Sequence, residues 1–175
     1  GQLIALDLQG PVELARTAPP PSPPPVPPQI EEVRSIETFL APEIAEGLVT
    51  VQSAGNTVTV TITGNGIFAS ASDRLEPRYE RVVERIAEAL EDEPGRIIVA
   101  GHSDNVPIRT ARFPSNLELS LARAQSVMDR ISARLSDTGR ITAEGRADRE
   151  PIASNESTEG RARNRRIDVI LVKAG

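Results

Sequence analysis

The sequence contains no cysteine, which excludes disulfides, thiolate metal sites and a cysteine nucleophile. Its single histidine, His102, excludes a metal motif built on two histidines. Three phenylalanines and one tyrosine are too few for a surface on which nucleic-acid bases stack. The net charge of -5 also argues against nucleic acid, because proteins that neutralise phosphates are normally basic. We therefore expect no metal, no cofactor and no nucleic-acid partner.

Long apolar runs are also lacking, since nothing approaches the roughly 18 apolar residues of a membrane span. The chain starts at Gly1 rather than Met, so we interpret it as a fragment or a processed chain.

Proline is abundant and concentrated near the N-terminus. Residues 19–28 read PPPSPPPVPP, which favours an extended polyproline II rod of about 30 Å. We interpret this segment as a spacer, and a ligand for a proline-binding module is the alternative. Residues 1–18 are too short for a domain and are interpreted as a residual upstream segment.

The rest of the chain alternates between patterns of helix and patterns of strand. A lead-in helix and turn are predicted over residues 29–47, and a folded domain over 48–175. Strict alternation over residues 57–63 and short apolar runs indicate strands, and apolar stripes with capping signals indicate helices. The predicted strands are 57–63, 96–100, 141–145 and 167–172, and the predicted helices are 29–40, 77–90, 115 to just before Gly139, and a short one near 157–164. This order predicts an α/β domain.

A candidate binding site follows the strand at 96–100, where the chain reads GHSDN. A strand that ends in a polar loop offers side chains at the edge of a sheet, and Asp104 is the charged group there. Asn116, Leu119 and Arg123 share one face of the next predicted helix. An acid and an arginine held close together can bind a zwitterion. In the alternative interpretation, Asp104 caps a turn or pairs with a nearby arginine.

Two further features favour structural roles. His102 lacks a partner for metal binding or catalysis, and we expect a hydrogen-bonded structural histidine. Four arginines gather near the C-terminus, but neighbouring acids dilute them, so a salt-bridged helix end is favoured over a site for polyanions. The arginines are Arg161, Arg163, Arg165 and Arg166, and the acids are Glu156, Glu159 and Asp168.

Four motifs, taken together and in order, resemble the OmpA-like peptidoglycan-binding domain, a family that includes MotB and the peptidoglycan-associated lipoprotein. They are GHSDN (101–105), SNLELSLARA (115–124), EGRADREPIASN (144–155) and EGRARNRRIDV (159–169). The resemblance covers about residues 48–173. The strings FLAPEIAEGLVTV (39–51) and GIFASAS (66–72) are most similar to the type VI secretion group typified by extended TssL, although MotB-like stator proteins share several of these strings.

The resemblance implies a mixed four-stranded sheet with helices packed on one face. It also implies a ligand, the meso-diaminopimelate of the peptidoglycan stem peptide, whose free D-centre is a zwitterion. Asp104 then takes the ammonium and Arg123 the carboxylate. Asn116 and Leu119 line the pocket between them. The turn of Phe68, Ala69 and Ser70 lies against the ligand.

Other family positions are less informative or differ. Arg165 and Arg166 match the NRR string, interpreted as mostly structural. Ser103 stands where the family has Thr, and Leu117 where close relatives often have Trp.

The resemblance implies a non-catalytic module that anchors a type VI secretion membrane complex to the cell wall. It would be a periplasmic domain tethered to the inner membrane of a Gram-negative bacterium. Its partners would be the stem peptide and other secretion subunits, with a homodimer as a further option. The alternative is a structural domain of a secretion or MotB-like stator complex that does not bind wall. A wall hydrolase needs paired carboxylates or a metal set, and the sequence offers neither.

Overall fold

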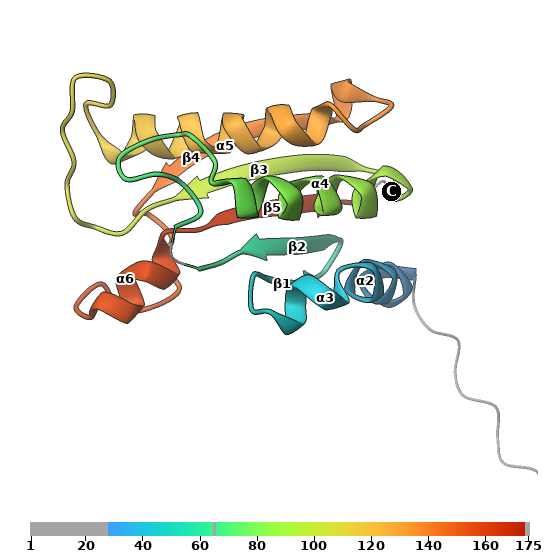
Figure 1. The fold of residues 1–175 in the computed structure, drawn as a ribbon. Coiled ribbons are helices and arrows are strands. Elements are labelled where there is room, and N and C mark those ends of the chain that lie inside the picture. The colour runs from blue at the N-terminus through green and yellow to red at the C-terminus, as the bar shows by residue number, and fades with distance from the viewer. Residues whose placement is uncertain (1–27, 65, 174–175) are drawn as a thin grey trace, which may run out of the picture.

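The structure, a computed structural model, describes residues 28–64 and 66–173 (Figure 1). The predicted upstream segment 1–18 and all but the last residue of the proline segment 19–28 lie outside the described residues. The helices are α2 (Pro28–Phe39), α3 (Ala41–Ala45), α4 (Pro77–Glu91), α5 (Asn116–Ser132), the 3-10 turn η1 (Thr138–Arg140) and α6 (Thr158–Asn164). The strands are β1 (Val49–Ala54), β2 (Thr57–Ile62), β3 (Arg96–His102), β4 (Ile141–Ala147) and β5 (Ile167–Val172).

The strands form one mixed sheet in the order β1-β2-β5-β3-β4. The only parallel neighbours among them are β3 and β4, and the other pairs are antiparallel. The mixed α/β fold predicted from the sequence is therefore confirmed, but the sheet has five strands rather than four. The additional strand is β1, which forms a hairpin with β2 through the turn at Gly55 and Asn56.

One face of the sheet is covered by α4 and α5, which run side by side along it (Figure 1). The alternation in β2 explains this arrangement, because Val58, Val60 and Ile62 are buried while the intervening threonines are partly exposed. The lead-in helix α2 joins the same core, where Ile36 and Leu40 are almost completely buried. It packs against β1, β2 and α4.

Local signals set the helix ends that matter for the site. Ser115 is the N-cap of α5, as the sequence predicts. Its hydroxyl accepts from the Leu117 amide at 3.2 Å and donates to the Glu118 carboxylate. The helix ends at Ser132 rather than continuing toward Gly139. Leu135 is still buried, but from the turn that follows the helix.

Close packing of α5 on the sheet depends on Gly101 near the end of β3. A Cβ at this position would collide with the backbone carbonyl of Ser120 in α5. The strand extends to His102, two residues beyond the predicted end at residue 100, and its register with β4 shifts between Gly101 and His102. The end of β3 and the first half of α5 are therefore held tightly together.

Candidate functional site

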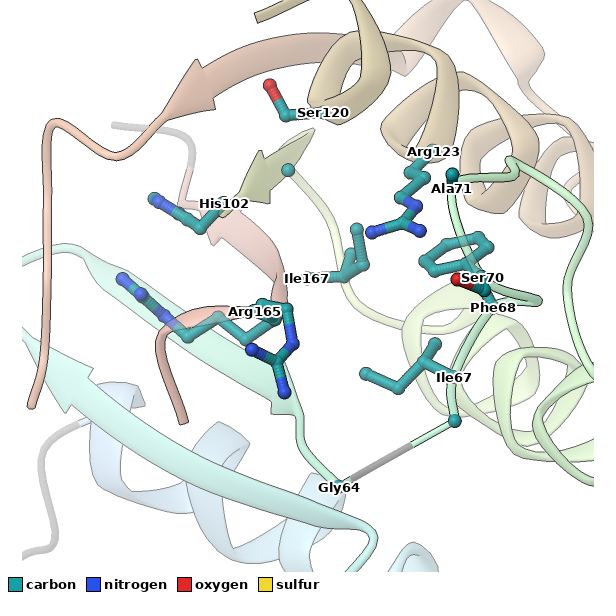
Figure 2. A pocket seen from close by; sticks show the side chains of 13 residues that line it. Gly64, Ile67, Phe68, Ser70, Ala71, His102, Ser120, Arg123, Arg165 and Ile167 are labelled. Carbon is teal, nitrogen blue, oxygen red and sulfur yellow. The ribbon is translucent and has the colours of Figure 1, made fainter. Parts of the chain in front are cut away.

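A cavity of about 190 Å³ lies beside the end of β3 (Figure 2). Its walls come from the loop after β2, the end of β3, the first half of α5 and the residues that enter β5. The lining residues are Gly64, Gly66, Ile67, Phe68, Ser70, Ala71, Gly101, His102, Ser120, Arg123, Arg165, Arg166 and Ile167.

Arg123 extends from α5 and points its guanidinium into the cavity (Figure 2). Its Nε donates to the Ser72 carbonyl at 2.7 Å, and its Nη2 donates to the Ala69 carbonyl at 3.5 Å. The guanidinium carbon lies 4.9 Å from the centre of the Phe68 ring, a cation–π contact. Arg123 thus holds the 69–72 turn in place, and its remaining donors are oriented for an anion.

Burial and the nearby charge of Arg165 lower the pKa of Arg123, while Asp73 and Asp104 act in the opposite direction. An arginine remains protonated at neutral pH even when its pKa is lowered. The cavity therefore holds a partly desolvated positive charge, which favours an anionic group of a ligand.

Asp104 is buried, with only 8% of its surface exposed, and it is not among the residues that line the cavity. Its Oδ1 accepts the Val106 amide at 3.0 Å, which caps the turn, and its Oδ2 lies 2.6 Å from Nη1 of Arg165. Both parts of the structural alternative for Asp104 are therefore observed. Asp104 is paired with Arg165, which lines the cavity, and not with Arg123.

The three residues of the Asn-Arg-Arg string at 164–166 contact different parts of the structure. Asn164 is fully buried, and its amide bonds the backbone at Ile152 and Ala153 and the side chain of Asn155. All the donors and acceptors of this side chain are used, so Asn164 fixes the loop before α6. Arg165 and Arg166, which the sequence interpretation treats as mostly structural, both form ion pairs, and both also line the cavity.

Arg166 belongs to a buried polar group around Asp168 of β5. The Nε atom of Arg166 lies 3.4 Å from Oδ1 of Asp168, and Thr61 donates to the same oxygen at 2.8 Å. Nε2 of His102 lies 3.0 Å from Oδ2. His102 is therefore paired inside the structure, as the sequence predicts. This group stabilises the end of β3 against β5, next to the cavity.

The predicted site residues fall into two sets. Phe68, Ser70 and Arg123 line the cavity, and Ala69 contributes the carbonyl that Arg123 contacts. Asn116 instead donates to the Val106 carbonyl at 2.8 Å, Leu119 is buried, and neither is part of the lining.

Sequence reasoning missed Arg165 as a cavity residue. Its partner Asp104 lies 61 positions away, a distance that local spacing does not reveal.

Neither a metal site nor a membrane span is found in the parts of the chain that the structure describes. No group of three or more His, Asp or Glu side chains there is placed to hold a metal ion. No helix within residues 28–64 and 66–173 is long and apolar enough to cross a membrane.

Part of the chain matches a known protein family. Residues 67–165, more than half of the chain, match the OmpA family. The chain belongs to the OmpA family. This membership confirms the expectation of a non-catalytic module, since the family consists of binding and structural domains rather than enzymes. The match begins just after β2 and ends at Arg165, so it contains the whole cavity except Gly64, Gly66, Arg166 and Ile167.

Individual relatives of this OmpA-family chain are anchors, motility proteins and peptidoglycan binders. The structure of the cell wall anchor of the type VI secretion system from Pseudomonas aeruginosa is 47% identical, with a TM-score of 0.75, and covers 79% of this chain and 97% of that one. Motility protein B of Bacillus subtilis is 30% identical over 84% of this chain and 58% of its own length. The peptidoglycan-binding protein ArfA of Mycobacterium tuberculosis is 34% identical over 69% of this chain and 35% of its own. The resemblance to the secretion group is confirmed by the first of these.

Proposed function

We propose that this chain binds peptidoglycan and anchors a type VI secretion membrane complex to the cell wall from the periplasmic side. The observation that carries the proposal is the cavity beside Arg123, in a chain whose sequence is 47% identical to that of a type VI secretion cell wall anchor. The anchoring role is proposed from the similarity to that cell wall anchor. The peptidoglycan ligand is proposed from the similarity to the peptidoglycan-binding protein ArfA as well. The proposed localisation is a periplasmic domain tethered to the inner membrane.

We further propose that the ligand group is the free D-centre of meso-diaminopimelate, whose ammonium and carboxylate form a zwitterion. Arg123 takes the carboxylate, and the ammonium approaches Asp104. The charges support this assignment. A guanidinium in the cavity with a carboxylate nearby offers complementary charges to a zwitterion. The backbone turn at Phe68, Ala69 and Ser70 would contact the carbon chain of the ligand.

A second candidate function is a structural domain that contacts other subunits and does not bind wall. The pairing of Asp104 with Arg165 favours this reading, because the acid is already satisfied without a ligand. The similarity to motility protein B leaves a stator complex as one possible assembly for such a domain. Direct binding experiments separate the two functions.

The test is an NMR titration of the chain with a stem peptide that contains meso-diaminopimelate. A stem peptide with lysine is the control, because it lacks the second carboxylate at the end of the side chain. We expect amide shifts near Ala69, Asp104 and Arg123 with the diaminopimelate peptide only. Absence of shifts at millimolar peptide would reject wall binding and favour the structural function.

Two variants test the residues. Asp104→Ala and Arg123→Ala should each abolish the shifts, because each removes one charged partner of the zwitterion. Arg112→Ala is the matched control, since Arg112 is an exposed arginine that pairs with Asp73 and does not line the cavity. Thermal unfolding shows that the variants are folded. Unchanged binding in both site variants would contradict the assignment of the ligand to this cavity.

A further inference from the structure

The charged side chains at the cavity have a net charge that a zwitterionic ligand group would not neutralise. Arg123 from α5 and Arg165 from the segment before β5 both line it (Figure 2), while Asp104 supplies one negative charge as the ion-pair partner of Arg165. The neighbouring charges form pairs of their own. Asp73 lies 3.0 Å from Arg112, and Asp168 lies 3.4 Å from Arg166. The site thus carries one positive charge in excess.

A ligand group with no net charge leaves that excess uncompensated in a partly desolvated cavity. A group with one ammonium and two carboxylates neutralises it, because the ammonium meets Asp104 and each carboxylate meets one guanidinium. Charge-assisted bonds of this kind are stronger than neutral ones, and arginine binds carboxylates through a planar fork.

Arg165 is free to make such a contact. Its side chain is 41% exposed, and its Nη1 pairs with the Asp104 carboxylate at 2.6 Å. Arg166, by contrast, is held in the buried group around Asp168 and is 5% exposed. An ammonium that approaches Oδ2 of Asp104 meets the like charge of Arg165. Rotation of Arg165 toward a carboxylate of the ligand removes this repulsion and requires no change in the core.

We propose that Arg165 binds a second carboxylate of the ligand, so that the site selects a group with one ammonium and two carboxylates over a bare zwitterion. The inference rests on the proposed function, because it takes Asp104 and Arg123 as the partners of the zwitterion. In a stem peptide the second carboxylate has two sources. One is the L-centre of a diaminopimelate that ends the stem, and the other is the α-carboxylate of the neighbouring glutamate.

The experiment measures the affinity of the full chain for three stem tripeptides of alanine, glutamate and meso-diaminopimelate. The first has all its carboxylates free. The second has a carboxamide at the L-centre of diaminopimelate, and the third has a carboxamide at the α-carboxyl of glutamate. We expect one of the two amidated peptides to bind about tenfold more weakly than the parent, because it loses one charge-assisted contact. The weaker peptide identifies the source of the second carboxylate.

Variants of Arg165 test whether this residue causes the difference in affinity between the parent peptide and the amidated peptides. Arg165→Gln should bind all three peptides with equal affinity, and Arg165→Lys, which keeps the charge but not the fork, should discriminate less than the native chain. Arg163→Gln is the matched control, because it removes the same charge from an exposed position on α6 and should discriminate as the native chain does. Thermal unfolding monitors the fold of each variant.

Three results would overturn the inference. Equal affinity of the native chain for all three peptides would reject the second carboxylate while leaving the zwitterion site intact. Full discrimination by Arg165→Gln would assign the carboxylate to another residue. No binding of the parent peptide by the native chain would reject the proposed function, and the role of Arg165 with it.

Discussion

Arg165 and Arg166 are neighbours in sequence but serve different parts of the molecule. Both stand between the end of α6 and the start of β5, and Arg165 is the C-cap residue of that helix. Both line the cavity, but Arg165 pairs with Asp104, while Arg166 reaches Asp168 and the Glu150 carbonyl. The fully bonded side chain of Asn164, directly before them, holds this segment and so supports the geometry of the cavity.

Asp168 makes the stability of the domain depend on pH. Burial raises the pKa of its carboxyl group, but the hydrogen bond from His102 and the charge of Arg166 outweigh this and leave it below its ordinary value. A lowered pKa in the folded state means that the carboxylate stabilises the fold above its unfolded pKa of about 3.9. This stabilisation is lost as the pH falls through the lower folded value.

We predict that Asp168→Asn lowers the free energy of unfolding by about 1–3 kcal/mol at pH 7, since a hydrogen-bonded buried charge is removed. The difference from the native chain should begin to shrink below about pH 4, where the carboxylate of the unfolded chain becomes protonated, and should disappear once the pH falls below the lower pKa of the folded state. Urea denaturation at pH 7, 5 and 3 measures both values. Asp148→Asn changes the same group at an exposed position and is the control. A difference that stays constant with pH would contradict the role given to the charge.

At the scale of the elements, α2 extends the domain beyond the family match. The match begins at residue 67, yet Ile36 of α2 is 1% exposed and belongs to the same core as β2 and α4. Arg85 of α4 also reaches back to this region, where it bonds the Phe39 carbonyl and the Glu43 carboxylate. We therefore propose that the lead-in helix folds together with the sheet.

We predict that Ile36→Ala destabilises the whole domain by about 2–5 kcal/mol, the usual cost of a cavity in a core. The loss should appear in a single cooperative transition, measured by urea denaturation followed by far-ultraviolet circular dichroism. Glu37→Ala, an exposed change one position along the same helix, should alter stability by less than about 0.5 kcal/mol. If Ile36→Ala behaved like the control, α2 would be an appendage that packs without stabilising the domain.

The elements also show where prediction from sequence succeeds. Strand β5 was predicted at residues 167–172, where the structure places it, because its apolar run lies between clear boundaries. Strand β1 was missed, because after Val49 and Val51 it continues as Gln52, Ser53 and Ala54, which lack the alternation of a half-buried strand. The Gly-Asn pair before β2 was the available signal, since such pairs join the strands of hairpins.

The candidate site was predictable only in part, for a related reason. Asp104 and Arg123 stand at recognisable positions, the end of a strand and one face of a helix, so their motifs identify them. The partner of Asp104 could not be predicted in this way, because Arg165 lies 61 positions later in the sequence. The two meet because β5 lies next to β3 in the sheet. Contacts across a sheet depend on strand order, which no local pattern in this sequence specifies.

For the whole molecule, the overall charge and the charge of the site have opposite signs. The chain carries a net charge of -5, whereas the cavity presents arginines and has no acidic residue among its described lining. A negative molecule does not gather anionic ligands through its long-range field. Recognition must therefore come from contacts inside the cavity, where only a few charged groups are available to a ligand. Binding by a single domain should accordingly be weak, since a few hydrogen bonds scarcely exceed the free-energy cost of association.

A weak site can still hold an assembly in place if several copies bind one polymer. We predict that fusing the chain to a dimeric coiled coil increases its retention on isolated cell wall by at least about 100-fold, because the second contact is made at high effective concentration. The affinity for a soluble stem peptide should not change, because each peptide meets one site. Co-sedimentation with cell wall and peptide titration measure the two quantities. A dimer that carries Arg123→Ala in one copy only should return to the retention of the monomer. Equal retention of the native monomer and the native dimer would show that the wall is held through something other than repeated single-site contacts.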